Sequence, residues 1–81
     1  MAAAARITLI TRLGCHLCEP AREVVRRVAA DTGHTWLEVC VDDDPELLAR
    51  WSDLVPVTLV DGAHHAHWRV DEGQLRDALA R

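Results

Sequence analysis

The stretch TRLGCHLCEP, residues 11–20, places two cysteines three positions apart, where an apolar run ends and a helical pattern begins. Residues 6–11 form a short run that is mostly apolar and β-branched, which is typical of a strand. From Leu17 the apolar residues recur with a helical period, at Leu17, Ala21, Val24, Val25 and Val28, and Gly33 closes the pattern as a C-cap. Cys15 and Cys18 therefore lie at the junction of a predicted strand and a predicted amphipathic helix.

The rest of the chain continues the alternation of strands and helices. Further strands are predicted at residues 36–41, 55–60 and 63–68, the last two joined by the hairpin signal Asp61-Gly62. Asp44 as N-cap and Pro45 at the first position open a second helix, and a capping box at residues 71–74, with Val70 and Leu75 as a hydrophobic staple, opens a third that runs to residue 81. The buried stripe of the second helix is predicted at Leu47, Leu48, Trp51 and Leu54.

The apolar pattern also predicts the order of the strands. The first and third strands are apolar on both faces and belong in the centre of a sheet, whereas the second and fourth mix polar and apolar residues as edge strands do. The first two strands, joined by a helix, should be parallel with a right-handed crossover, and the hairpin makes the last two antiparallel. We therefore predict a single α/β domain over residues 1–81, in the order βαβαββα. Its four-stranded mixed sheet has the order 2-1-3-4 and is flanked by three helices.

Composition excludes several classes of function. The chain has 81 residues, 49% of them hydrophobic, and a net charge of −4, which disfavours nucleic acid as a partner. No apolar stretch approaches the roughly 20 residues that span a membrane, and the N-terminus lacks the pattern of a secretory signal. We expect a cytoplasmic monomer. In the cytoplasm a close cysteine pair is more often catalytic or metal-binding than structural, and the odd count of three cysteines also disfavours a disulfide framework.

The spacing of Cys15 and Cys18 favours redox chemistry. A thiol at a helix N-terminus ionises more readily, and the thiolate is the nucleophile in disulfide exchange. Cys18, one helical turn further on, is placed to resolve a mixed disulfide at Cys15. His16 would take the first helical position. Pro20 conflicts with a helix at His16, so either the first turn is distorted or the regular helix begins later.

Other interpretations of the roles of the cysteines and histidines stay open. The pair could pack in a core, or bind a metal together with Cys40 and the histidines, although the strands that carry these residues should lie at opposite edges of the sheet. Strand alternation places His65 and His67 on one face and His64 on the other. The two histidines that share a face would make only a weak metal site. We expect a solvated edge for the histidines and a buried, inert thiol for Cys40.

The chain resembles proteins with the thioredoxin fold and, more closely, the small glutaredoxin-like proteins with a GCHLC motif. The resemblance rests on GCHLC at residues 14–18, DPEL at residues 44–47, VPV at residues 55–57, DG at residues 61–62 and the late Trp68. It implies that Val55-Pro56 is a cis peptide facing the dithiol, and that the backbone of Val55 pairs with an extended peptide or glutathione. Three departures from glutaredoxins are found. His16-Leu17 replaces the usual Pro-Tyr between the cysteines, Arg12 replaces a common lysine, and residues 67–71, which keep at most Asp71, replace the glycines that grip glutathione.

We therefore predict a small thiol–disulfide oxidoreductase without a cofactor. Its catalytic residues would be Cys15 and Cys18, and its substrate-binding residues Arg12, His16, Val55, Pro56, Trp68 and Asp71. The expected partners are a disulfide-containing protein or a small thiol as substrate, and thioredoxin reductase or a cellular thiol as reductant. The alternatives are a carrier of a metal or an iron–sulfur cluster, and a redox-inert module that binds ligands in the groove beside Val55-Pro56.

Overall fold

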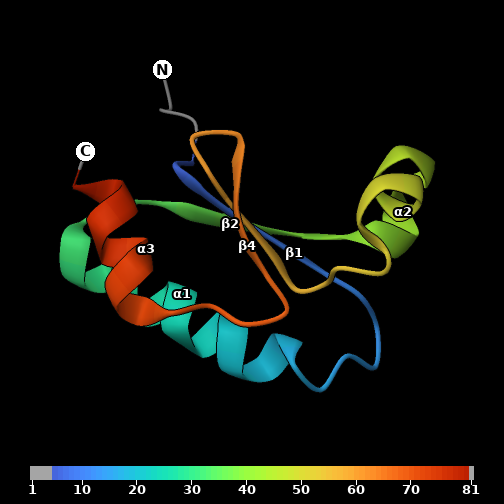
Figure 1. Cartoon of the computed structure of the whole chain (residues 1–81), viewed down its shortest axis with the longest axis horizontal. Coiled ribbons are helices and arrows are strands. Elements are labelled where there is room, and N and C mark those ends of the chain that lie inside the picture. The colour runs from blue at the N-terminus through green and yellow to red at the C-terminus, as the bar shows by residue number, and fades with distance from the viewer. Residues whose placement is uncertain (1–4, 81) are drawn as a thin grey trace.

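The fold follows the predicted order of elements in a computed structural model, which describes residues 5–80 (Figure 1). The elements are β1 (Ile7–Thr11), α1 (Cys18–Thr32), β2 (Trp36–Cys40), the short 3-10 helix η1 (Val41–Asp43), α2 (Pro45–Trp51), β3 (Val57–Val60), β4 (Ala63–His67) and α3 (Glu72–Leu79). The order of the strands in the sheet is β2-β1-β3-β4, as predicted. β1 runs parallel to β2 and antiparallel to β3, and β3 and β4 form the hairpin.

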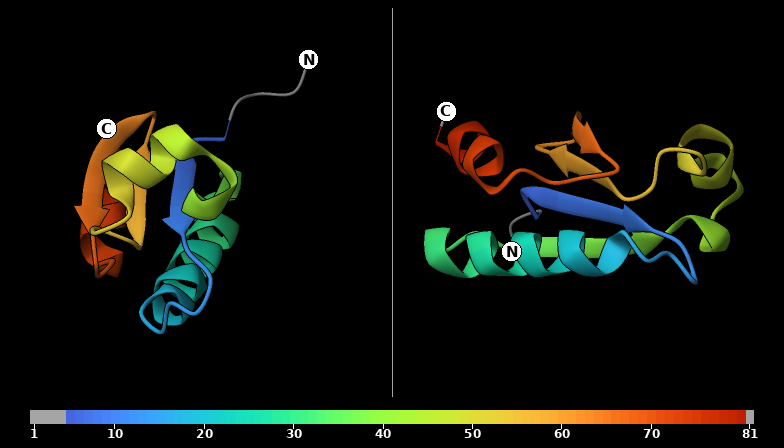
Figure 2. Two further views of the ribbon diagram at one scale, coloured as in Figure 1. Left: turned by 90° about the vertical axis from the view of Figure 1, so that its right-hand side faces the viewer. Right: turned by 60° about the horizontal axis from the view of Figure 1, so that its bottom comes forward.

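The two faces of the sheet bury different clusters of side chains. Ile7 and Leu9 of β1 face α1 and α3, where Val25, Val28 and Leu75 complete the larger cluster. The next cluster contains Ile10, Val41, Val55 and Val57, against which side chains of α2 and the loop after it pack. Figure 2 shows this arrangement, with α1 running along the sheet and α2 set apart at one end.

The ends of the helices follow the capping signals. Gly33 adopts a left-handed conformation (φ 76°) after α1, which only glycine reaches without strain. Asp44 accepts a hydrogen bond from the Glu46 N–H (2.9 Å), and Asp71 accepts one from the Gln74 N–H (2.8 Å). Val70 packs against the cluster that contains Leu75, as the predicted staple requires. The predicted buried stripe of α2 is confirmed only in part. Leu47 and Trp51 are half-buried against the sheet, Leu48 is exposed, and Leu54 packs there from the loop after the helix.

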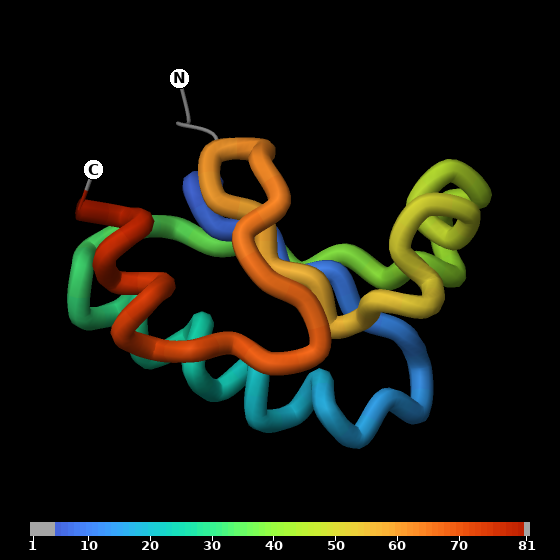
Figure 3. Tube along the Cα trace, in the orientation of Figure 1, coloured from blue at the N-terminus to red at the C-terminus, as the bar shows by residue number. Residues whose placement is uncertain are grey.

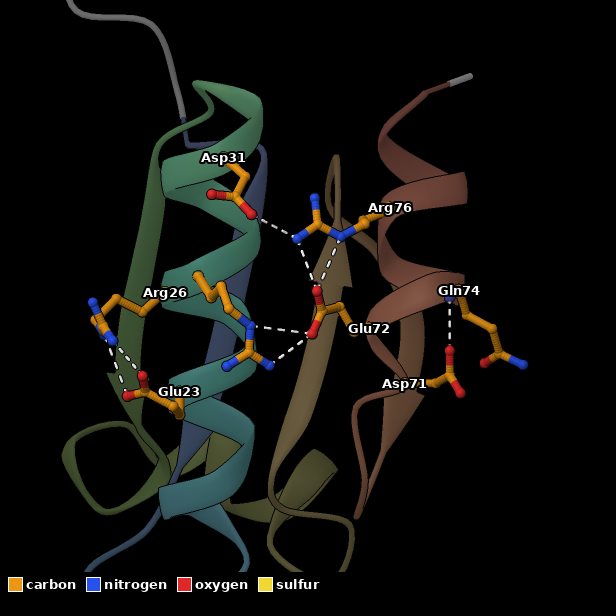
Figure 4. A network of polar contacts seen from close by, with 8 residues as sticks. Glu23, Arg26, Asp31, Asp71, Glu72, Gln74 and Arg76 are labelled. Carbon is orange, nitrogen blue, oxygen red and sulfur yellow. Dashed lines mark hydrogen bonds and ion pairs between the residues drawn. The ribbon is translucent and has the colours of Figure 1, made fainter.

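Ion pairs attach α3 to the C-terminal half of α1. Arg27 pairs with Glu72, and Arg76 pairs with both Asp31 and Glu72, at N···O distances of 2.6–2.8 Å (Figure 4). The N-terminal half of α1 has a different neighbour: the segment after β4 passes over it before α3 begins (Figure 3). The two cysteines lie at the start of α1, away from the ion pairs with α3.

Candidate active site around Cys15 and Cys18

Cys15 and Cys18 are joined by a disulfide in the turn that precedes α1. Their Cα atoms are 5.4 Å apart, and the N–H of Cys18 donates to the carbonyl oxygen of Cys15 (3.3 Å), which closes the turn. Cys18 is only 2% exposed, whereas Cys15 is partly exposed. The two sulfurs are therefore unequal: a molecule arriving from solvent meets Cys15 first.

Pro20 determines where α1 begins. The helix starts at Cys18, and His16 and Leu17 belong to the turn, so the expectation that His16 takes the first helical position is wrong. The ring of a proline clashes with the carbonyl of the residue four positions earlier, here His16, and a proline has no N–H to donate. Within the first turn of a helix that starts at Cys18, the missing N–H costs no helical hydrogen bond. The later start was one of the two alternatives that the sequence left open.

The N-terminus of α1 has no side-chain cap. Leu17 occupies the N-cap position and offers no oxygen to the free N–H groups of the first turn. These N–H groups and the helix dipole favour a negative charge nearby. The turn that holds Cys15 precedes this end directly, so the thiolate form of Cys15 gains from it when the disulfide is open.

The segment at Val55-Pro56 lies beside the disulfide. Cys15 packs against the buried cluster that includes Val55. The peptide bond between Val55 and Pro56 is cis, which confirms the expectation from the resemblance. Among the described residues, neither the N–H nor the carbonyl of Val55 has a backbone hydrogen-bond partner. Both groups are therefore without an internal backbone partner in this part of the chain, although the residue as a whole is only 8% exposed.

Trp68 is held against the same segment. Its backbone N–H donates to the carbonyl of Pro56 (2.8 Å), and its indole Nε1–H donates to the carbonyl of Asp53 (3.1 Å). The residue adopts a left-handed backbone conformation (φ 66°), which is uncommon for a bulky side chain. Its side chain nevertheless remains 52% exposed. The two hydrogen bonds fix a large aromatic surface in a position where solvent can reach it.

A groove of about 330 Å³ separates Trp68 from the start of α1. One wall contains Leu17, Pro20 and Val24, and the other contains Trp68, Arg69 and Val70. The helical period assigned Leu17 and Val24 to the buried face of α1, but Leu17 is 45% exposed and Val24 is partly exposed. Sequence reasoning missed this groove, although the apolar Leu17 between two cysteines was a signal for it.

The other predicted substrate-binding residues take separate positions. Arg12 is exposed, and its guanidinium donates to the carbonyl of Ser52 (3.2 Å) after α2. His16 is exposed in the turn between the cysteines. Asp71 caps α3 through its carboxylate. Contacts thus connect Cys15 with Cys18 and with the cluster of Val55, and Pro56 with Trp68, whereas Arg12 is turned toward Ser52 and Asp71 is occupied as a helix cap.

The remaining histidines and Cys40 lie apart from the disulfide. A β-bulge in the pairing of β3 with β4 inserts His65 as an extra residue, so that His64 and His67 share a face, with ring nitrogens 3.1 Å apart. The predicted alternation of these histidines is therefore wrong. Cys40 is partly exposed rather than buried, on the opposite edge of the sheet. Between residues 5 and 80 no group of three or more His, Cys, Asp or Glu side chains is arranged to hold a metal ion.

Comparison with known proteins identifies the family. The model of the family described as "Glutaredoxin-like domain (DUF836)" matches residues 6–80. The chain belongs to this glutaredoxin-like family. Its fold is similar to that of thioredoxin. Membership of the glutaredoxin-like family, together with the close cysteine pair, indicates a thiol oxidoreductase in general terms.

Relatives of this glutaredoxin-like chain occur in bacteria. It is 35% identical to the uncharacterized protein Rv0508 of Mycobacterium tuberculosis, with 94% of this chain and 84% of that protein covered. The X-ray structure of protein XcR50 from X. campestris is similar, with 31% identity, a TM-score of 0.74 and coverage of 91% and 95% of the two chains. Thioredoxin from Fasciola hepatica shares the fold, with a TM-score of 0.63, 21% identity and coverage of 93% and 77%. In the described part of the glutaredoxin-like chain, no helix is long and apolar enough to cross a membrane.

Proposed function

We propose that this glutaredoxin-like protein is a small thiol–disulfide oxidoreductase that reduces disulfides through Cys15 and Cys18. The observation that carries the proposal is the disulfide itself: two cysteines three residues apart are bonded at the start of a helix, with Cys18 2% exposed and Cys15 accessible. A structural disulfide would not need one sulfur at the surface beside an uncapped helix end and an open groove.

The reaction begins with the reduced protein. The Cys15 thiolate attacks one sulfur of the substrate disulfide; the substrate S–S bond breaks, and the departing sulfur takes up a proton as a free thiol. Cys18 then loses its proton and attacks the sulfur of Cys15. The mixed disulfide breaks, the second substrate thiol leaves, and the Cys15–Cys18 disulfide forms. Two electrons pass from the protein to the substrate, and a reductant returns them in the reverse exchange.

The neighbouring groups support the mixed disulfide. The free N–H and carbonyl of Val55 offer a substrate backbone two hydrogen bonds beside Cys15. Pro56 holds Trp68 in place through its carbonyl, and Trp68 forms one wall of the groove. Arg12 and His16 stand at the exposed edge, where a positive charge would favour a thiolate. Asp71 keeps the groove wall in place by capping α3.

The proposal includes a location and a reductant. The protein would act as a monomer in the reducing cytoplasm, where an exposed disulfide can be reopened. Glutathione would not be its obligate reductant, because Trp68 and Arg69 stand where its γ-glutamyl group would need small residues. A flavin-dependent thioredoxin reductase, or another cellular thiol, would supply the electrons.

A turnover assay tests the proposal. The wild-type protein, with NADPH and thioredoxin reductase, should reduce a disulfide-linked peptide catalytically. Cys15→Ser should abolish turnover and Cys18→Ser should reduce it strongly, whereas Cys40→Ser is the matched control and should retain full activity. Full activity of Cys15→Ser would contradict the proposal. A parallel assay with glutathione and its reductase should give slower turnover.

A further inference from the structure

The groove between Leu17 and Trp68 offers an apolar binding surface, which disulfide exchange alone does not require. It starts at Leu17, between the two cysteines, and its walls are mostly apolar. Its volume of about 330 Å³ is within the range of small ligand pockets, and it accommodates a large aliphatic or aromatic side chain. A concave, mostly apolar surface with a few polar groups at its rim is the usual form of a binding pocket.

Trp68 connects the groove to the segment that contains the free backbone groups of Val55. Trp68 forms its far wall and is hydrogen-bonded to Pro56, the next residue after Val55. An extended polypeptide that pairs with Val55 while its cysteine is bonded to Cys15 therefore passes beside the groove. Residues of an extended chain advance about 3.3 Å each, so a side chain within two positions of that cysteine reaches it.

Arg69 adds a charge to the rim of the groove. Among the arginines between residues 5 and 80, Arg69 alone has no side-chain hydrogen bond, ion pair or aromatic partner: five others pair with carboxylates, Arg12 binds the carbonyl of Ser52 and Arg50 lies over Trp51. Arg69 is also exposed. In a chain of net charge −4, an unpaired cation at this place is complementary to an acidic group of a partner.

We propose that the substrate is a polypeptide whose disulfide cysteine is flanked, within two residues, by a large apolar side chain and an acidic residue. The apolar side chain enters the groove between Leu17 and Trp68, and the carboxylate pairs with Arg69. This inference rests on the proposed function, and it deepens that function by replacing a small thiol with a protein substrate. Glutathione has no apolar side chain for the groove, and its γ-glutamyl group would meet apolar walls.

A competition for the sulfur of Cys15 tests the inference. A protein with Cys18→Ser and Cys40→Ser keeps Cys15 as its single thiol. It is mixed with pairs of cysteine peptides that are supplied as their disulfides together with free peptide thiol, so that thiol–disulfide exchange distributes Cys15 between the two mixed disulfides and releases peptide thiols. The peptides of a pair differ only by leucine against serine, two positions before or two positions after the cysteine. The ratio of the two adducts, read by mass spectrometry, should favour leucine roughly fivefold at one of these positions, since part of the side chain leaves water.

Matched variants separate the groove from general effects. Leu17→Ser should bring the ratio of adducts to about one. Leu13, like Leu17, is two residues from Cys15 in the sequence, but it is 82% exposed and lies outside the groove, so Leu13→Ser should leave the ratio unchanged. Both leucines are exposed, so neither change threatens the fold. A ratio of adducts also cancels any change in the reactivity of Cys15.

A second pair of peptides tests the charge. With aspartate against asparagine beside the leucine, aspartate should be favoured roughly two- to fivefold at low salt, the range for an exposed ion pair. Arg69→Gln should abolish this preference, and Arg50→Gln, at an exposed arginine outside the groove and the active site, should preserve it. Glutathione should lose to the leucine peptide in direct competition.

The outcomes distinguish the two proposals. Adducts on Cys15 that form equally with all peptides, or a preference unaffected by Leu17→Ser, would overturn the inference and leave the oxidoreductase intact. Failure of Cys15 to form any adduct, with peptides or with glutathione, would overturn the proposed function itself.

Discussion

The backbone N–H of Trp68 donates a 2.8 Å hydrogen bond to the carbonyl of Pro56, so the segment before α3 and the segment beside the disulfide form one unit. A second bond, from the indole of Trp68 to the carbonyl of Asp53, fixes the ring. The groove is therefore a preformed feature of the fold, because its aromatic wall is anchored at both the backbone and the side chain.

Replacing Trp68 with glycine should separate stability from substrate preference. The change loses the indole hydrogen bond, which is worth about 1 kcal/mol, but relieves the left-handed backbone (φ 66°), which costs a non-glycine residue about as much. The buried half of the indole contributes about 2 kcal/mol more, so Trp68→Gly should lower the free energy of unfolding by about 2 kcal/mol, while removing the preference for apolar peptides. Urea denaturation and the peptide competition measure the two effects, with Trp68→Phe as the control that keeps an aromatic wall. A strongly destabilised glycine variant would show that the ring is a core element.

The ion pair between Arg22 and Glu38 should make stability depend on acid. Arg22 donates to both carboxylate oxygens of Glu38 (2.7 and 2.9 Å), and these bonds lower the pKa of the Glu38 carboxyl despite an opposing effect of burial; Thr11 also donates to it. The stabilisation is present in full above the ordinary pKa of 4.5 and is lost as the pH falls through the lowered value. The pair connects α1, which carries Cys18, to the edge of the sheet.

Glu38→Gln tests this ion pair. Because the two side chains are 35% and 31% exposed, solvent screens the pair, and we expect the variant to lose about 1 kcal/mol of unfolding free energy at pH 7. The difference from wild type should be smaller at pH 3 than at pH 7, because the carboxyl of Glu38 takes up a proton below its ordinary pKa of 4.5. Urea denaturation at the two pH values measures it, with Glu23→Gln, at the exposed end of an ion pair within α1, as the control. A deficit that persists unchanged in acid would assign the loss to packing instead of charge.

Alkylation kinetics should show that the two cysteines differ. After reduction, Cys15 is partly exposed beside the free N–H groups of α1, whereas Cys18 is 2% exposed. Iodoacetamide should therefore modify Cys15 at least about tenfold faster than Cys18 at pH 7, since the thiolate is the reacting form. The measurement uses Cys40→Ser protein and assigns each modified peptide by mass. Faster modification of Cys18 would reverse the assigned roles.

The topology was predictable because apolar composition differs between central and edge strands. β1 (ITLIT) and β3 (VTLV) contain only apolar residues and threonine and lie in the centre, whereas β4, with three histidines, lies at an edge. The face of each histidine was not predictable. The bulge at His65 depends on how β4 fits against β3, and one extra residue moves every following side chain to the opposite face.

The cysteine pair could be predicted, but the groove beside it could not. The helical period shows that Leu17 and Val24 share a face with Val28, yet it does not show how far a neighbour covers that face. α3 packs along the C-terminal half of α1 through Arg27 and Asp31, which leaves the beginning of the apolar stripe facing Trp68 across open space. The coverage depends on the path of residues 68–71, which the sequence pattern does not specify.

Trapping the mixed disulfide tests most directly the claim that Cys15 attacks and Cys18 resolves. Reduced Cys18→Ser protein, mixed with a disulfide-linked peptide, should accumulate one adduct, and peptide mapping should place it on Cys15. The wild-type protein should instead release both peptide thiols and gain the Cys15–Cys18 disulfide, with Cys40 still free. An adduct on Cys40, or Cys15→Ser protein that accumulates an adduct on Cys18 as fast, would contradict the claim.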